Sequence, residues 1–282
     1  MRQLVLYLLL IVPAGGCATH RSLSPLAPLE RSLVYYPRPY PDGDWEPPYL
    51  PIEDAWFTAQ DGTKLHGWYV PHPNPRAVAL FCHGNAGNIA SRAPGLAVLH
   101  YRHQVSVLAF DYRGYGRSEG TPSERGILMD ARAALAWLEE RTGHRPEEMV
   151  FMGRSLGGGV AVDLAAEHNP RGLVLASTFT SLPEVGKHFT PILPTRLIMT
   201  QRLNSKAKIA NYHGPLLMSH GNEDSIVPYE LGVELFEAAP GRKQFITIDG
   251  GDHNDQQSEE YSRAFDAFIA SLSRQGSGER VR

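Results

Sequence analysis

The sequence lacks the features that mark several classes of protein. Its 282 residues include 27 Lys and Arg against 30 Asp and Glu, which gives a formal net charge of −3. This near-neutral balance offers no basic footprint for binding nucleic acid, so we expect no nucleic-acid partner. No internal repeat or block of like charge stands out, and the length fits one large α/β domain or two small ones.

Motifs for metals and cofactors are lacking as well. Twelve histidines are present, but none stands with a glutamate in an H-E-x-x-H or related spacing. We therefore expect no metal site and no organic cofactor.

Cysteine is scarce, with only Cys17 and Cys82 in the chain. Cys82 ends the apolar run 77–82, so we predict a small, buried core residue there. If Cys17 carries a lipid, Cys82 has no partner. A structural disulfide is therefore not expected.

The first residues read as a targeting signal. After a basic start, residues 4–12 form an apolar run that is too short to cross a bilayer alone. Small residues then lead to Cys17. This spelling resembles a bacterial lipobox, although Ala14 stands where leucine is usual. The resemblance implies a signal peptide over 1–17, a lipidated Cys17 and a place in the bacterial envelope on the periplasmic side. Ala18 favours the outer membrane. The alternative is an ordinary secretory signal cleaved nearby.

The rest of the chain divides by composition. Residues 18–50 are rich in proline and predict an extended tether whose second half packs onto the domain. The domain itself is expected over 51–272, followed by a flexible tail at 273–282. Residues 179–212 carry three prolines and no clear strand. They are either a lid or a longer crossover helix with decorated loops.

Hydrophobic patterns in the domain predict strands that alternate with helices. A hairpin over 54–70, turned at Asp61-Gly62, comes first. Further strands are expected at 77–82, 105–110, 149–152, 173–176, 216–219 and 244–248, and helices at 91–101, 123–140, 229–238 and 258–272. This order predicts an α/β fold, with a mostly parallel, eight-stranded sheet covered by helices on both faces.

The motif Gly153-Arg154-Ser155-Leu156-Gly157 lies between a predicted strand and a predicted helix. A backbone that turns sharply at the serine requires glycine two positions before and after it. Strand, G-x-S-x-G and helix in this order predict a nucleophile elbow with Ser155 as the nucleophile. A plain glycine-rich turn that matches by chance is the alternative.

A serine hydroxyl needs a base, and the base needs a carboxylate to orient it. His253 follows the last predicted strand on a glycine-flanked loop, so we predict that it is the base. Asp224 follows the strand 216–219 and is the preferred acid. Its competitors are Glu223, Asp249 and Asp252.

The negative charge formed during attack needs two amide donors. The N–H of Leu156, at the start of the elbow helix, is the first. The glycine-rich loop 83–88 follows another strand and offers the second, for which we choose the N–H of Asn85. His83 on this loop is expected to serve a structural role.

Five motifs in order resemble those of α/β-hydrolases. They are H-G-N-A-G-N at 83–88, D-Y-R-G-Y-G-R-S at 111–118, G-R-S-L-G-G at 153–158, H-G-N-E-D at 220–224 and G-G-D-H at 250–253. The first two motifs resemble those of the serine-aminopeptidase-like and bud-emergence-protein-like branch of this superfamily, which includes depalmitoylase-type enzymes. This resemblance implies Asp224 rather than Glu223 as the acid and a structural role for the loop 111–118.

The sequence thus predicts a serine hydrolase that cleaves carboxylic esters or thioesters through an acyl-enzyme. The alternatives are a peptidase or amidase of the same fold, and a non-catalytic envelope protein on a hydrolase scaffold. We expect a monomer that meets the membrane through its lipid anchor and acts on a small or acylated substrate. Apolar residues of the insertion would line an acyl pocket or serve as core contacts: Phe179, Leu182, Phe189, Ile192, Leu193, Leu197, Ile198 and Met199.

Overall fold

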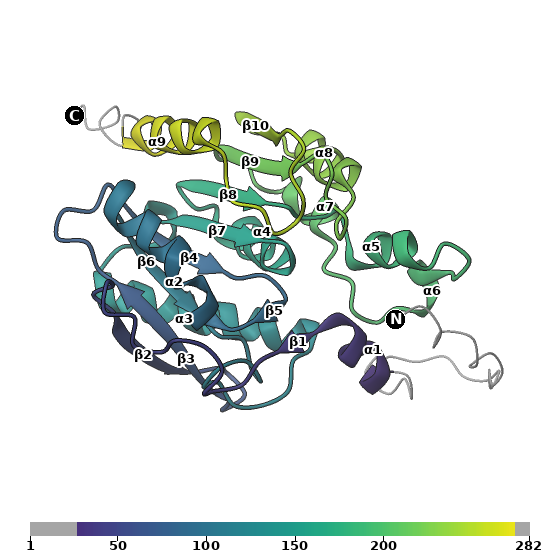
Figure 1. Cartoon of the computed structure of the whole chain (residues 1–282), viewed down its shortest axis with the longest axis horizontal. Helices are drawn as coiled ribbons and strands as arrows, with labels where there is room; N and C mark the ends of the chain where they lie inside the picture. Colours follow the sequence, from purple (N-terminus) through teal and green to yellow (C-terminus); the bar gives the residue numbers. More distant parts are fainter. Residues whose placement is uncertain (1–26, 274–282) are drawn as a thin grey trace.

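The computed structural model describes residues 27–273. An eight-stranded sheet in the order β10-β9-β8-β7-β4-β6-β3-β2 forms its centre (Figure 1). The pairs β2–β3 and β3–β6 are antiparallel, and the other five pairs are parallel. The predicted α/β fold with a mostly parallel eight-stranded sheet is confirmed.

The elements follow one another closely along the chain. The strands are β1 Tyr36–Pro37, β2 Glu53–Thr58, β3 Lys64–Val70, β4 Ala77–Cys82, β5 Ala86–Gly87, β6 Val105–Phe110, β7 Val150–Arg154, β8 Gly172–Ala176, β9 Leu216–Gly221 and β10 Lys243–Ile248. The α-helices are α1 Ala27–Val34, α2 Ala93–Ala97, α3 Glu124–Thr142, α4 Leu156–His168, α5 Leu182–Phe189, α6 Thr195–Ile198, α7 Ser205–Ile209, α8 Tyr229–Ala238 and α9 Glu259–Ser273. Short turns of other helix types are η2 Ile89–Arg92, η3 Val98–Arg102 and η4 Pro146–Glu148.

The sheet separates two hydrophobic cores. One core joins the sheet to α3, α4 and α8 through residues such as Ile127, Val160 and Leu235. The other joins it to α2 and α9 through residues such as Leu96 and Phe265. Strands β4 and β6 are almost wholly buried because helices cover both faces, which explains why all their residues except Ser106 are apolar.

The predicted tether 18–50 is described from residue 27 onward. There it forms α1 and then β1, which pairs with β5. Tyr35 is buried and donates a hydrogen bond to Gln201, while Trp45 packs against Trp68 at 5.6 Å between ring centroids. Residues 27–50 are therefore in contact with the domain. The predicted signal 1–17, Cys17 and most of the tail 273–282 lie outside the described residues.

The insertion 179–212 forms α5, α6 and α7 rather than one crossover helix. In Figure 1, α5 and α6 project from the body at the end of the molecule where α1 lies. The Glu30 carboxylate of α1 accepts hydrogen bonds from the main-chain N–H groups of Thr200 and Gln201, which ties α1 to the chain after α6. Within 27–273, no helix is both long and apolar enough to cross a membrane.

Candidate active site

Ser155 occupies a sharp turn between β7 and α4. Its φ of 52° and ψ of −120° lie outside the regions that most side chains adopt. A Cβ on Gly157 would lie 2.0 Å from the carbonyl oxygen of Cys82, and one on Gly153 would lie 2.3 Å from the carbonyl oxygen of Gly157. Both positions therefore require glycine, for the steric reason that the sequence indicated.

The three side chains predicted to act together are in direct contact. His253 Nε2 lies 3.1 Å from Ser155 Oγ, and His253 Nδ1 lies 2.8 Å from Asp224 Oδ2. All three residues are less than 10% exposed: Ser155 at 8%, Asp224 at 9% and His253 at 6%. The loops after β9 and β10 bring Asp224 and His253 to the carboxyl end of β7 because these strands run parallel.

Asp224 is held by more than His253. Its Oδ1 accepts the N–H groups of Ile226 and Val227, at 2.9 and 2.7 Å, and His220 Nε2 lies 3.1 Å from its Oδ2. Burial alone would raise the pKa of Asp224. The hydrogen bonds from His220, His253 and Val227 outweigh that effect and hold its pKa well below the usual range. The carboxyl group is therefore ionised wherever the fold is intact at neutral pH.

The competing carboxylates have other partners. Asp252 accepts hydrogen bonds from the N–H groups of Ser225 and His253, and Asp249 accepts one from the Asn222 side chain. Glu223 is exposed. In the described part of the chain, Asp224 is the one candidate of the four whose carboxylate contacts the imidazole ring of His253. Asp252 instead holds the backbone that carries the ring, through the His253 N–H.

The two predicted oxyanion donors lie on elements that meet at Ser155. Leu156 is the first residue of α4, directly after the nucleophile. Asn85 lies on the loop after β4, where a Cβ on the neighbouring Gly84 would come within 3.5 Å of Ser155 Cβ. The Asn85 side-chain oxygen accepts the Tyr115 hydroxyl at 3.0 Å and the Tyr36 N–H at 3.2 Å, which fixes the loop in place.

His83 and Asp111 form a buried pair beside this loop. His83 Nδ1 lies 2.7 Å from the Gly84 carbonyl oxygen, to which it donates its proton, so Nε2 presents a lone pair to Asp111 Oδ1 at 3.6 Å. Burial raises the pKa of Asp111 to about 8 and, with the charge of Arg92, lowers the pKa of His83 to about 3. Both groups are neutral in the fold at pH 7. A neutral His83 fits the structural role expected for it.

Two contacts of the site carry no sequence motif that we recognised. Arg154, the second residue of the elbow, donates a hydrogen bond to the main-chain carbonyl of His253. His220 contacts Asp224 as described above and also lies 3.0 Å from the Val227 carbonyl oxygen. The only signal of either contact was a polar side chain inside a predicted motif. Arg154 meets a residue 99 positions away in the sequence, and the contact of His220 depends on how the loop after β9 folds back.

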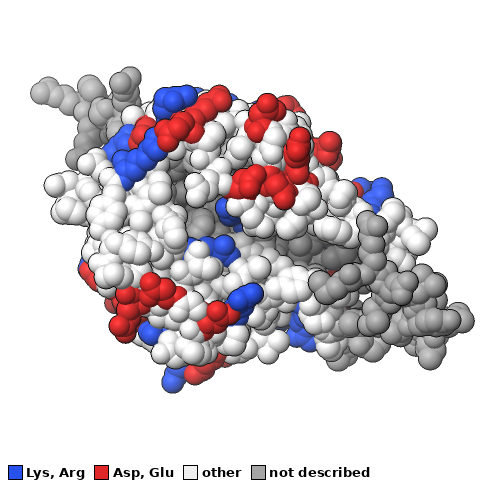
Figure 2. Space-filling view, viewed as in Figure 1, with Lys and Arg blue, Asp and Glu red and all other residues white. Residues whose placement is uncertain are grey.

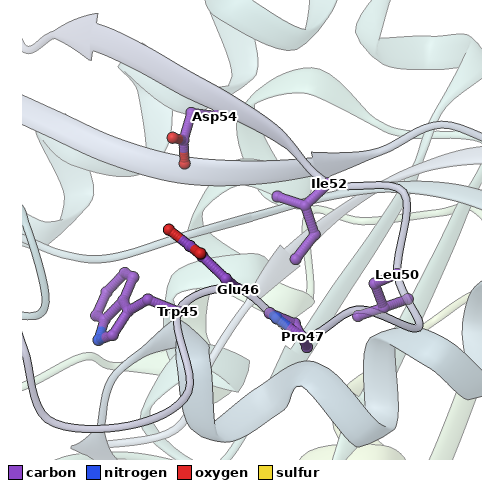
Figure 3. A pocket seen from close by; sticks show the side chains of 6 residues that line it. All are labelled: Trp45, Glu46, Pro47, Leu50, Ile52 and Asp54. Carbon is purple, nitrogen blue, oxygen red and sulfur yellow. The ribbon is translucent and has the colours of Figure 1, made fainter.

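Two hollows of moderate size lie away from the three side chains. The first, about 290 Å³, lies at the β2 edge of the sheet and is lined by Trp45, Glu46, Pro47, Leu50, Ile52 and Asp54 (Figure 3). The second, about 260 Å³, lies beneath the insertion between residues such as Ser181 and Arg202. Neither is lined by Ser155 or His253. No group of three or more His, Cys, Asp or Glu in the described part of the chain is arranged to hold a metal ion.

Comparison with known families agrees with this geometry. A family model described as "Serine aminopeptidase, S33" matches residues 73–213, which include the elbow and the loop after β4. The chain belongs to this hydrolase family. An uncharacterised member from Mycobacterium tuberculosis is 42% identical over 233 residues, covering 81% of this chain and 82% of that protein. The alpha/beta hydrolase domain-containing protein WAV2 of Arabidopsis thaliana is 33% identical over 227 residues, covering 73% of each chain.

Solved structures share the fold of this family member. An esterase of Pyrococcus furiosus superposes with a TM-score of 0.71 at 21% identity, covering 85% of this chain and 97% of the esterase. An enzyme from Butyrivibrio proteoclasticus with bound ferulic acid gives a TM-score of 0.66 at 20% identity, covering 78% of this chain and all of the other. At such low identity the likeness establishes the α/β-hydrolase fold. The substrate is a separate question.

Proposed function

We propose that this hydrolase cleaves carboxylic esters or thioesters with Ser155 as nucleophile, His253 as base and Asp224 as the carboxylate that orients the base. The continuous chain of contacts from Ser155 Oγ through His253 to Asp224 Oδ2 carries the proposal. Each distance allows a hydrogen bond, so the three groups meet the geometric condition for a nucleophile activated by a base.

The proposed reaction transfers an acyl group to water. Asp224 accepts Nδ1–H of His253, which leaves Nε2 free to take the proton of Ser155 as the hydroxyl attacks a carbonyl. The N–H groups of Leu156 and Asn85 would stabilise the oxyanion, and the loss of one such donor costs about 3 kcal/mol in the barrier. The protonated His253 then protonates the leaving group. A water molecule, deprotonated by the same ring, releases the acyl group and restores Ser155.

A labelling experiment tests the nucleophile. A fluorophosphonate probe should label the wild-type protein and leave Ser155→Ala unlabelled, with a loss of p-nitrophenyl ester hydrolysis of about 10³-fold or more. Labelling that persists in the alanine variant would reject the assignment. A wild-type protein that is folded, unlabelled and inactive on esters would instead favour a binding protein on a hydrolase scaffold.

We propose ester or thioester substrates rather than amides because the insertion is short. Peptidases of this fold commonly add a large cap or propeller domain. Within residues 27–273, the insertion between β8 and β9 contributes only the short helices α5, α6 and α7. The family description names an aminopeptidase, so a direct comparison is needed. Hydrolysis of an amino-acyl p-nitroanilide faster than of the matching p-nitrophenyl ester would establish the peptidase instead.

Lipid-like or acylated substrates are supported by the surface of the insertion. Phe179 and Leu182 are buried in the core, whereas Ile192, Leu197 and Phe189 are 94%, 82% and 58% exposed. The eight apolar residues of the insertion therefore divide between core contacts and a surface available to an acyl chain. An ester panel of increasing acyl length, run on wild type and Ser155→Ala, measures the preference.

We further propose that the protein works as a lipid-anchored monomer of the bacterial envelope, with the outer membrane favoured. The proposal rests on the apolar run and the small residues that precede Cys17 in the sequence. If the lipid holds the protein, Cys17→Ser should move it from the membrane fraction to the soluble periplasmic fraction. Wild-type and Cys17→Ser proteins that fractionate alike would remove the anchor from the proposal.

A further inference from the structure

Arg92 and Arg154 each contact a loop that carries a residue of the proposed site. Arg154 ends β7 immediately before Ser155, and its guanidinium donates to the main-chain carbonyl of His253. Arg92 ends the turn η2, and its guanidinium donates to the carbonyl of Ala86 on the loop that follows β4. One cation therefore lies at the loop of the proposed base, and the other at the loop of a proposed oxyanion donor.

Neither guanidinium forms a salt bridge among residues 27–273. The hydrogen bonds of both guanidinium groups go to peptide carbonyls, and Arg92 Nε is buried with no acceptor. Burial and the charge of the neighbouring Arg154 lower the pKa of Arg92. Burial also lowers the pKa of Arg154, against the attraction of Asp224 and Asp255. Figure 2, which labels no single residue, shows Lys and Arg side chains with Asp and Glu side chains beside them near the middle of one face.

A structural role alone does not explain two cations here. A neutral amide side chain can donate to a peptide carbonyl, so holding the two loops requires no charge. Two like charges that are partly withdrawn from water and form no salt bridge destabilise the fold. An anion bound between them would reverse that effect, because the planar fork of arginine matches the oxygens of a carboxylate or phosphate.

We propose that Arg92 and Arg154 bind an anionic group, a carboxylate or a phosphate, on the substrate whose ester or thioester bond is attacked by Ser155. The inference rests on the proposed hydrolase function and adds the charge of its substrate. It also gives Arg154 a second task as a positioning residue, because the same guanidinium holds the backbone of His253.

Matched substrate pairs test the charge preference on the full chain. The p-nitrophenyl monoester of glutaric acid is compared with p-nitrophenyl butyrate, and palmitoyl lysophosphatidic acid with monopalmitoylglycerol. The first pair adds a carboxylate and the second a phosphate. We expect kcat/KM to favour the anionic member of at least one pair by about tenfold or more, with most of the difference in KM. The pair that shows it identifies the anion.

Variants then locate the preference. Arg92→Gln should lower the anionic-to-neutral ratio of kcat/KM by about 10- to 100-fold, and Arg92→Lys should retain part of it. Arg263→Gln removes the same charge from an exposed position on α9 and should leave the ratio unchanged. An Arg92→Gln protein whose rates on both members of a pair fall equally would show that Arg92 only supports the loop, and would overturn the proposal.

The remaining outcomes separate this inference from the proposed function. A wild-type enzyme that cleaves the neutral member of both pairs at least as well as the anionic one keeps the hydrolase and loses the anion site. If no ester is cleaved and Ser155 is not labelled, the hydrolase proposal fails. Calorimetric titration of Ser155→Ala with glutarate and with glycerol 3-phosphate then tests anion binding independently of catalysis. If one of the anions binds and the additional substitution Arg92→Gln abolishes that binding, the anion site is supported. If neither anion binds, the anion site is rejected.

Discussion

His220 Nε2 lies 3.1 Å from Asp224 Oδ2, the same oxygen that contacts the ring of His253. His220 is fully buried, and a Cβ on Gly232 would come within 2.1 Å of its Nδ1, so packing leaves the ring little freedom. The carboxylate oxygen that faces the proposed base is thus also held by His220. This contact makes His220 a positioning residue for the carboxylate.

Substitution of His220 should therefore affect turnover more than substrate binding. His220→Phe removes the donor to Asp224, and we expect kcat on a p-nitrophenyl ester to fall about 10- to 100-fold, with KM within about threefold of wild type. His220→Gln keeps an N–H donor and should recover part of the loss. Equal activity of His220→Phe and wild type, with both proteins folded by circular dichroism, would contradict the assigned role.

The buried pair of His83 and Asp111 predicts how stability changes with pH. The raised pKa of Asp111, about 8, means that the fold binds a proton that the unfolded chain releases near pH 4. Its contribution is full below pH 4 and is lost as the pH rises toward 8. His83, with a pKa of about 3, contributes stability above pH 6.5 that is lost as the pH falls. The two trends oppose each other between pH 4 and 6.5, and only that of Asp111 remains above this range.

Urea unfolding at a series of pH values measures this effect. From pH 6.5 to 8 the wild-type free energy of unfolding should decrease by about 2 kcal/mol through Asp111. Asp111→Asn cannot ionise and should show a flatter profile over that interval. Asp249→Asn changes a carboxylate at the surface and should follow the wild type. Parallel profiles for wild type and Asp111→Asn would show that Asp111 is ionised in the fold.

Two glycines of α4 provide a matched test of the elbow. A Cβ on Gly157 would meet the backbone oxygen of Cys82 at 2.0 Å, whereas a Cβ on Gly159 would meet the side chain of Leu203 at 3.2 Å. Gly157→Ala should therefore displace the end of β4, lower ester hydrolysis at least 100-fold and destabilise the fold by about 2 kcal/mol or more. Gly159→Ala should change stability by no more than about 1 kcal/mol, because its gain in helix propensity offsets the tight contact. Full activity of Gly157→Ala would show that the backbone there tolerates a side chain.

Ile192 and Leu197 form the exposed tip of the insertion. Substitutions there should change substrate preference without changing stability. Replacing both Ile192 and Leu197 by serine should leave the free energy of unfolding within about 0.5 kcal/mol of wild type, since both side chains are largely in water. If the tip contacts an acyl chain, kcat/KM on a twelve-carbon ester should fall several-fold and that on an acetate ester should not. Leu182→Ala is the buried control, with an expected loss of about 2–3 kcal/mol. An unchanged chain-length profile in the double variant would exclude the tip from substrate binding.

Much of the sheet could be predicted because its strands are buried on both faces. The expected strands 77–82 and 105–110 have the same bounds as β4 and β6, since helices on each side favour apolar residues at nearly every position. The segment 27–34 was expected to be part of an extended tether, but it forms α1. Its helix is tied to the insertion by Glu30, a contact 170 residues away in the sequence that no local pattern reveals.

The sequence by itself determined the order of strands and helices and the three residues proposed for catalysis, because a sharp elbow and loops at parallel strand ends have local spellings in glycine, serine, aspartate and histidine. Only the tertiary structure decided that Arg92 and Arg154 donate hydrogen bonds to the loops of Asn85 and His253, and that His220 supports Asp224. Burial and the distance between charges depend on the whole packed chain. They have no counterpart in the sequence around any one of these residues.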